Sequence, residues 1–217
     1  MQSETIVRQL RNPASAAVAG IIFSVILLVV LVQLHTSVPA GRPSTDWLTD
    51  ADRRQGVQVA VGLIPFAGIA FLWFIGVIRT RLGDREDKLF ATVFLGSGLL
   101  FVALLFLAGA ILATLLTLFD RGIPVEADSM ILLVVFTKSL FGMFGARMAA
   151  VFTISVSSVG LRTGILPRWL VLLGYITGVI LLLSPPLSNW TQVLFPTWVL
   201  LFSGYILVAS RHLPAAQ

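Results

Sequence analysis

The sequence predicts an all-α membrane protein, a six-transmembrane-helix bundle that forms a single domain over residues 1–217. Hydrophobic residues make up 57% of the chain and charged residues only 12%, and a soluble domain of this length cannot bury so much apolar surface. The apolar residues also gather in runs of roughly 20 residues or more, the length that a helix needs to cross a ~30 Å hydrocarbon core. We therefore expect a multi-pass protein of the plasma membrane.

Each predicted helix corresponds to one apolar run. Asn12 and Pro13 are typical of a helix N-cap and first turn, and Pro65 inside the second run predicts a kink. Thr49 and Asp52 have the spacing of a capping box, which indicates a helix start just before the second run. The predicted helices cover about 14–34, 57–78, 89–118, 130–160, 168–186 and 191–210.

The distribution of positive charge between the runs predicts the orientation. If the N-terminus is inside, the inner segments contain nine Lys and Arg residues and the outer loops contain four. Cytoplasmic loops carry the excess of positive charge in membrane proteins, so both termini are expected in the cytoplasm. Six acidic residues then face outside: Asp46, Asp50, Asp52, Asp120, Glu126 and Asp128.

The fourth run has a stripe of small residues. At about 100° per residue they fall on one face of a helix, and such a face lets two membrane helices approach closely. The stripe therefore predicts a helix-packing surface. Its members are Ser139, Gly142, Ala146, Ala149, Thr153, Ser157 and Gly160.

Two cations, Lys138 and Arg147, lie in the same apolar run and are the candidate binding residues. Arg147 either extends its side chain to the phosphates of the inner leaflet or faces a cavity deeper in the membrane, where it would need an anionic partner. Lys138 either pairs with acids of the outer side or lines an outer vestibule for a substrate. On an uninterrupted helix the two side chains project in different directions, so they are not expected to form one site.

Residue types that support common catalytic and metal sites are scarce. The chain contains no cysteine, which excludes disulfides and thiolate sites, and His35 and His212 are predicted on opposite sides of the membrane, where they cannot share a metal or haem. We expect no catalytic residues, no metal and no cofactor. The net charge of +5 is interpreted as a topology signal and not as a nucleic-acid binding surface.

Two segments resemble parts of known sequences. Residues 136–175 (FTKSLFGMFGARMAAVFTISVSSVGLRTGILPRWLVLLGY) and 73–103 (WFIGVIRTRLGDREDKLFATVFLGSGLLFVA) are similar to segments of uncharacterised actinobacterial integral membrane proteins. The resemblance implies a small multi-span membrane protein, and it supplies no catalytic residues.

Three functions remain open on the sequence. The first is a non-enzymatic helix-bundle or accessory component of the membrane, whose partners are membrane lipids and either a second copy of the chain or another membrane protein. The second is a small transporter or channel that uses Arg147 for an anionic or amphiphilic molecule. The third is a lipid-modifying enzyme that uses Asp50 and Asp52 at the outer surface.

Overall fold

A computed structural model describes residues 13–38, 45–82, 88–164, 166–184 and 189–212. Every regular element in these ranges is helical, as the sequence predicts for an all-α protein. The α-helices are α2 (Pro13–Ser37), α3 (Ala51–Leu82), α4 (Lys88–Asp120), α5 (Ala127–Ser139), α6 (Ala146–Thr163), α7 (Arg168–Leu183) and α8 (Leu194–His212). Three shorter elements are η1 (Asp46–Leu48), η3 (Leu140–Gly145) and η4 (Asn189–Val193).

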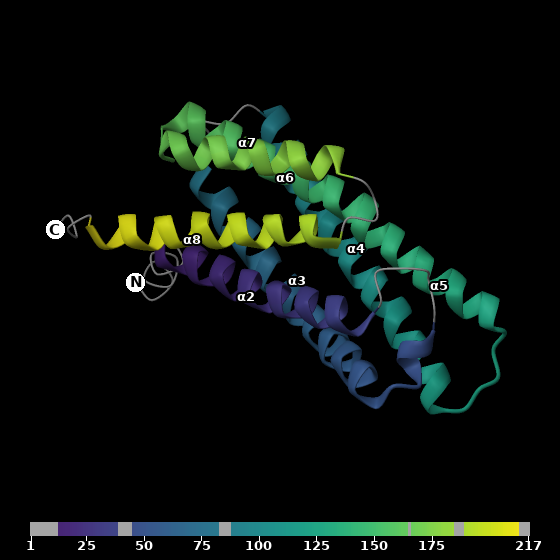
Figure 1. Cartoon of the computed structure of the whole chain (residues 1–217). Coiled ribbons are helices and arrows are strands. Elements are labelled where there is room, and N and C mark those ends of the chain that lie inside the picture. The colour runs from purple at the N-terminus through teal and green to yellow at the C-terminus, as the bar shows by residue number, and fades with distance from the viewer. Residues whose placement is uncertain (1–12, 39–44, 83–87, 165, 185–188, 213–217) are drawn as a thin grey trace, which may run out of the picture.

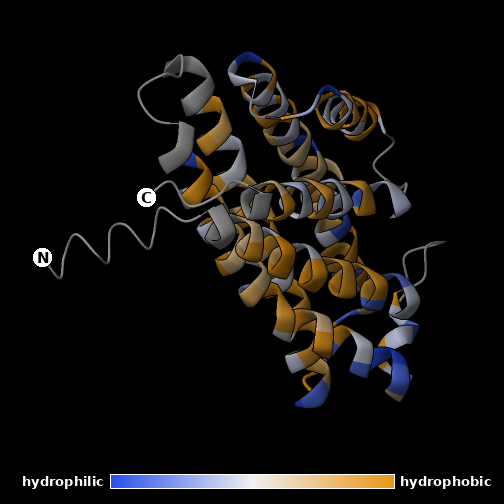
Figure 2. Cartoon of the chain, turned by 90° about the vertical axis from the view of Figure 1, so that its left-hand side faces the viewer, coloured by the Kyte–Doolittle hydropathy of each residue, from blue (hydrophilic) through white to orange (hydrophobic). Residues whose placement is uncertain are grey.

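Within the described residues, five helical segments are long and apolar enough to cross a membrane: Ala17–Ser37, Ala51–Arg79, Thr92–Asp120, Ala127–Thr163 and Trp190–Ala209. The helix α7 is apolar but has only 16 residues. At 1.5 Å per residue it is about 24 Å long, which is less than the ~30 Å thickness of the hydrocarbon core. Figure 2 shows that hydrophobic residues cover most of the helices, whereas hydrophilic residues gather toward their ends.

The contacts between helices form a closed ring, and Figure 1 shows how the helices run along the bundle. The helix α2 contacts α3 and α8, and α4 contacts α3, α5 and α6. The helix α7 closes the ring because it contacts both α6 and α8. The start of α2 and the end of α8 lie at one end of the bundle, and η1, the start of α3 and the α4–α5 turn lie at the other. We call this second end the η1 end.

Phenylalanine side chains fill the middle of the ring. The ring of Phe71 on α3 lies 4.4 Å from that of Phe23 on α2 and 5.0 Å from that of Phe152 on α6, measured between centroids. Phe101 on α4 and Phe195 on α8 complete the cluster at 5.4 and 5.7 Å. An aromatic side chain buries about 150–250 Å² of its own surface when it packs in a core. The cluster therefore joins five helices through one side chain, Phe71.

The fourth apolar run forms one continuous helical segment over Ala127–Thr163, but it is not regular throughout. Its middle part, Leu140–Gly145, is a π-helix, in which each N–H bonds to the carbonyl five residues before it. The expectation of an uninterrupted α-helix is wrong here, because the wider turn changes the angle between residues before and after it. The predicted angular relation of Lys138 to Arg147 therefore does not apply.

Pro65 lies inside α3, and the helix continues on both sides of it. Proline has no N–H to donate to the carbonyl four residues before it, so α3 lacks one internal hydrogen bond at this point. The kink at Pro65 stays a prediction.

Candidate functional site

A cavity of about 100 Å³ lies toward the η1 end, between α2, α3, α4 and α5. Residues from α2, α3, α4, α5, η3 and η4 form its wall. Most of them are aliphatic, and they include Val30, Leu31, Ile64, Leu105 and Leu112. Four polar side chains, those of His35, Thr137, Lys138 and Gln192, also belong to the wall.

Lys138 lies in the last turn of α5 and is half-buried. Its side chain already has an interaction within the protein. The π-helical segment follows two residues later, and two of its residues, Phe141 and Gly142, form the adjacent part of the cavity wall. π-helical turns occur often at functional sites. The π-helical segment and Lys138 therefore meet at the wall of this cavity.

His35 lies in the last turn of α2 and contributes a second polar group to the same wall. Its ring packs against Trp190, with centroids 4.5 Å apart. Its Nε2 atom is buried and has no hydrogen-bond partner.

Arg147 lies one residue inside α6 and does not reach this cavity. It is half-buried, and its guanidinium donates a hydrogen bond of 2.8 Å to the Met143 carbonyl in the preceding turn. A smaller cavity of about 10 Å³ borders Ala146 and Ala149, and Arg147 does not line that one either. The structure therefore brings Lys138, and not Arg147, to the larger cavity. A binding role for Arg147 stays a prediction.

The small-residue stripe lies mainly between helices. Six of its members are buried and Ser139 is half-buried. Ser157 contacts Gly174 of α7 so closely that a Cβ atom on Gly174 would collide with the Ser157 hydroxyl, and Leu166 would meet a Cβ on Gly160 in the same way. The Thr153 hydroxyl donates a 2.7 Å bond to the Ala149 carbonyl of its own helix. Of the stripe, Ser157 thus lies where α6 and α7 approach each other, whereas Ala146 and Ala149 border a small cavity shared with α2, α4 and α8.

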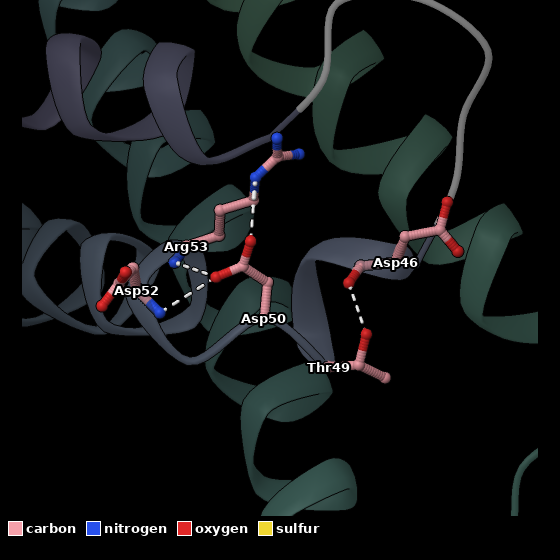
Figure 3. A network of polar contacts seen from close by, with 5 residues as sticks. All are labelled: Asp46, Thr49, Asp50, Asp52 and Arg53. Atoms are coloured by element: carbon pink, nitrogen blue, oxygen red, sulfur yellow. Dashed lines mark hydrogen bonds and ion pairs between the residues drawn. The ribbon is translucent and has the colours of Figure 1, made fainter.

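The acidic residues at the η1 end form a local network with the start of α3 (Figure 3). Asp50 Oδ1 accepts hydrogen bonds from the backbone N–H groups of Asp52 and Arg53 at 3.1 and 3.3 Å. Its Oδ2 lies 3.3 Å from Arg53 Nε. The Thr49 hydroxyl instead donates to the Asp46 carbonyl at 2.8 Å. The capping box predicted for Thr49 and Asp52 is therefore wrong, because Asp50 is the residue that caps α3.

Arg54 connects three elements at the η1 end. Its guanidinium donates a 2.7 Å hydrogen bond to the Leu48 carbonyl of η1. The same group lies 3.9 Å from Asp120 at the end of α4 and 5.1 Å from the centroid of the Phe119 ring. These contacts hold η1 over a second hydrophobic cluster that includes Trp47, Leu48 and Val57.

Two residues of the cavity wall, His35 and Gln192, were not expected as site residues. The sequence suggested His35 only as a metal ligand, and that role was rejected because the second histidine is remote. The sequence contained one indication that His35 could lie near Lys138. Both residues are predicted in the outer half of their membrane helices, and therefore at a similar depth in the membrane. Among the described residues no group of three His, Cys, Asp or Glu side chains could hold a metal ion.

The chain has no significant match to protein-family models, to curated proteins or to solved structures.

Proposed function

We propose that the chain is a non-enzymatic integral membrane protein with six transmembrane helices and both termini in the cytoplasm. The observation that carries this proposal is the exposed apolar surface of the helices. Phe66 and Trp73 on α3 and Leu172 on α7 are each about 60% exposed, and large exposed hydrophobic side chains also occur on α2, α4, α5 and α8. Soluble monomers rarely expose contiguous apolar patches beyond a few hundred Å², whereas lipid tails accommodate such a surface.

The number of crossings is supported by the position of the helix ends. The start of α2 and the end of α8 lie at the same end of the bundle, and this arrangement supports an even number of crossings. The sixth span would be α7, which fits between α6 and α8. A helix shorter than the hydrocarbon core is accommodated by local thinning of the bilayer at modest cost.

The orientation is supported by the charges. Asp46, Asp50, Asp52 and Asp120 all belong to elements at the η1 end, and the positive-inside rule places this end outside. Arg162 near the end of α6 and Arg168 at the start of α7 would then lie at the cytoplasmic side.

The non-enzymatic role is supported by what the polar side chains do. The hydroxyls of Ser24, Thr137 and Thr153 donate hydrogen bonds to backbone carbonyls of their own helices. Asp50 caps α3, which gives one of the acids considered for lipid chemistry a structural role. Lipids and other membrane-embedded chains remain the proposed partners, and membership of the actinobacterial family stays a prediction.

The cavity favours a second candidate, a protein that binds an anionic or amphiphilic molecule for transport or sensing. The sequence placed this role on Arg147. The observation that supports it concerns Lys138, because this cation lines a cavity of about 100 Å³ with an otherwise mainly aliphatic wall.

Single-cysteine labelling tests the topology, and the chain is suited to it because it has no cysteine of its own. Glu126, Arg168 and Trp190 are exposed and mark the chain before α5, at the start of α7 and before α8. In intact cells that express Glu126→Cys or Trp190→Cys, we expect an impermeant maleimide to label the protein. Arg168→Cys should react only after the cells are permeabilised.

Specific outcomes would overturn the proposal. Labelling of Arg168→Cys and Trp190→Cys from the same side would show that α7 does not cross the membrane. Labelling of Arg168→Cys alone in intact cells would reverse the orientation. Extraction of the native chain by alkaline carbonate would exclude an integral membrane protein.

A further inference from the structure

We propose that Arg147 binds the phosphodiester group of a phospholipid in the leaflet on the η1 side, which is the outer leaflet in the proposed orientation. The inference deepens the proposed role of lipids as partners and rests on the proposed placement of the helices in a membrane. It differs from the expectation from the sequence, which connected Arg147 with the phosphates of the inner leaflet.

The charge of Arg147 is the first reason to expect an anionic ligand. Its guanidinium makes no ion pair with any residue that the structure describes, and its one hydrogen bond goes to the Met143 carbonyl, a neutral acceptor. A charge on a membrane helix is unfavourable unless it is paired or reaches a polar environment. The counter-charge must therefore come from outside the described part of the chain.

The unoccupied part of the guanidinium has the geometry that binds a phosphate. The bond to Met143 uses Nη1, whereas Nε and Nη2 of Arg147 have no hydrogen-bond partner and retain accessible surface. The N–H groups of these two atoms lie on one edge of the guanidinium and fit two oxygens of the same anion. The bond to Met143 also restricts the side chain before a ligand binds, which lowers the entropy cost of binding.

The packing of α6 against α7 indicates the level of Arg147 along the bundle. A Cβ on Gly178 would collide with Ile154, and Leu181 borders the same small cavity as Ala146. The residue numbers fall along α6 while they rise along α7, so the two helices are antiparallel. Arg147 follows Ala146 directly and is therefore level with the last turn of α7.

That end of α7 has the residues of a membrane boundary. The helix ends at Leu183, and the Ser184 hydroxyl then accepts a 3.4 Å hydrogen bond from Thr191 of η4. Trp190, also in η4, is 68% exposed, and tryptophan is enriched at the level of the lipid headgroups. With α7 as the sixth span, this boundary lies on the η1 side of the bilayer.

The length of α6 agrees with this depth. Arg147 is the second residue of α6, which ends at Thr163, so the helix beyond it is about 24 Å long at 1.5 Å per residue. This is also the length of α7, and it is close to the thickness of a locally thinned hydrocarbon core. Because the arginine side chain can extend toward the headgroups, its guanidinium reaches the phosphate level beside α7.

The chemistry of this level favours a phosphodiester. Each phospholipid headgroup carries a phosphodiester with a single negative charge, which one guanidinium balances. Apolar side chains adjoin the same level, since Phe144 is 50% exposed and Leu183 is 75% exposed. The acyl chains of the bound lipid would contact such residues below the phosphate.

Native mass spectrometry of the purified full-length protein in detergent tests the phosphate contact. The probe is dioleoylphosphatidylglycerol, and we expect saturable binding. Dioleoylglycerol has the same chains without the phosphate and should bind about 10-fold or more weakly. Glycerophosphoglycerol has the same headgroup without the chains and represents a soluble anion, and an equal concentration of it should not displace the lipid.

Matched variants locate the contact. Arg147→Met should weaken binding of dioleoylphosphatidylglycerol about 10- to 100-fold, because it removes charge-assisted hydrogen bonds. Arg147→Lys keeps the charge but not the two parallel N–H groups, so its affinity should lie between those of Arg147→Met and the native chain. Arg53→Met is the control, because it removes a cation from the η1 end, and it should bind normally.

Cysteine labelling tests the depth independently of the lipid. An impermeant maleimide should label Arg147→Cys from the same side of the membrane as Glu126→Cys, and Arg162→Cys from the opposite side. If all three labels are reversed, the orientation in the proposed function is wrong, whereas the position of Arg147 on the η1 side is upheld.

Several results would overturn the inference. Equal binding of dioleoylglycerol by the native chain would show that the phosphate is not recognised, whether or not the Arg147 variants fold. Displacement by glycerophosphoglycerol would indicate a site for a soluble anion. An equal loss in Arg53→Met would leave only an effect of net charge. Labelling of Arg147→Cys from the side of Arg162→Cys, or from neither side, would remove Arg147 from the headgroup level while the six-span proposal still stands.

Discussion

The middle of the bundle and its η1 end are built from largely the same helices but are packed differently. In the middle, Phe71 lies within 5.7 Å of four other phenylalanine rings from four helices. At the η1 end the helices leave a cavity of about 100 Å³, and polar atoms such as His35 Nε2 and Trp47 Nε1 are buried without a partner. One region is filled with large apolar side chains, and the other has space and unused polar groups.

The size of the side chains that face the interior of the bundle accounts for this difference. Where α2, α4, α6 and α8 converge on α3, aromatic rings span the distance between them. Toward the η1 end, the residues that face the interior from α2 and α4 include Val30, Leu105 and Ala108, which are shorter. The same set of helices is therefore filled by aromatic side chains in its middle and leaves a cavity at its η1 end.

The largest expected effect comes from Phe71→Ala in the middle of the bundle. Loss of a fully buried phenylalanine typically destabilises a protein by about 3–5 kcal/mol, and Phe71 is 0% exposed. Phe66→Ala on the same helix is the control, because Phe66 is 61% exposed and should change stability little. Unfolding by SDS in mixed micelles, followed by circular dichroism, measures both. Equal effects of the two substitutions would contradict the proposed aromatic core.

Replacing one alanine by leucine in each region should change the stability of the protein in opposite directions. Ala67→Leu adds volume to the close-packed cluster, where Ala67 is 0% exposed, and overpacking typically costs about 1–3 kcal/mol. Ala108→Leu adds the same volume to the cavity wall and should stabilise the protein by about 0.5–2 kcal/mol. The measurement is thermal unfolding in detergent. Destabilisation by both variants would indicate that the cavity is closed in solution.

A smaller effect is expected at the surface of the η1 end. Arg54→Ala removes the bonds to Leu48 and Asp120 and the contact with Phe119, and should cost about 1–2 kcal/mol because charge-assisted hydrogen bonds are stronger than neutral ones. Arg53→Ala removes one exposed ion pair with Asp50 and should cost less than about 0.5 kcal/mol. Both values come from the same denaturation experiment. If Arg53→Ala is the more harmful, Arg54 does not hold η1 in place.

The smallest effect concerns the contact between α6 and α7. A Cβ on Gly174 would collide with the Ser157 hydroxyl and lie 2.9 Å from Trp198 Nε1, so Gly174→Ala should cost about 1 kcal/mol after its gain in helix propensity. Gly76→Ala is the control, because a Cβ there has no neighbour within 4 Å, and it should be stabilising by about 0.5–1 kcal/mol. Equal stabilities would show that α7 is not closely packed against α6.

Several parts of the fold were predictable from local pattern. The apolar runs locate the five long helices because the length and hydropathy of a span depend on the residues within it. The π-helical segment was not predictable in this way. Leu140–Gly145 has no proline, and its sequence has the pattern of a regular apolar α-helix. The cap of α3 depends on which of several neighbouring polar side chains has the right geometry, and Asp50 rather than Thr49 has it.

The sequence by itself determined that the chain is all-helical, that it has apolar helices long enough for a membrane and that Lys138 and Arg147 are its unusual residues. Only the tertiary structure decided which cation meets other polar groups. His35, Lys138 and Gln192 come from three separate elements, and their meeting in one cavity wall depends on how α2, α5 and η4 pack around the bundle. Packing of that kind is set by contacts between distant residues, which the periodicity of a single helix does not contain.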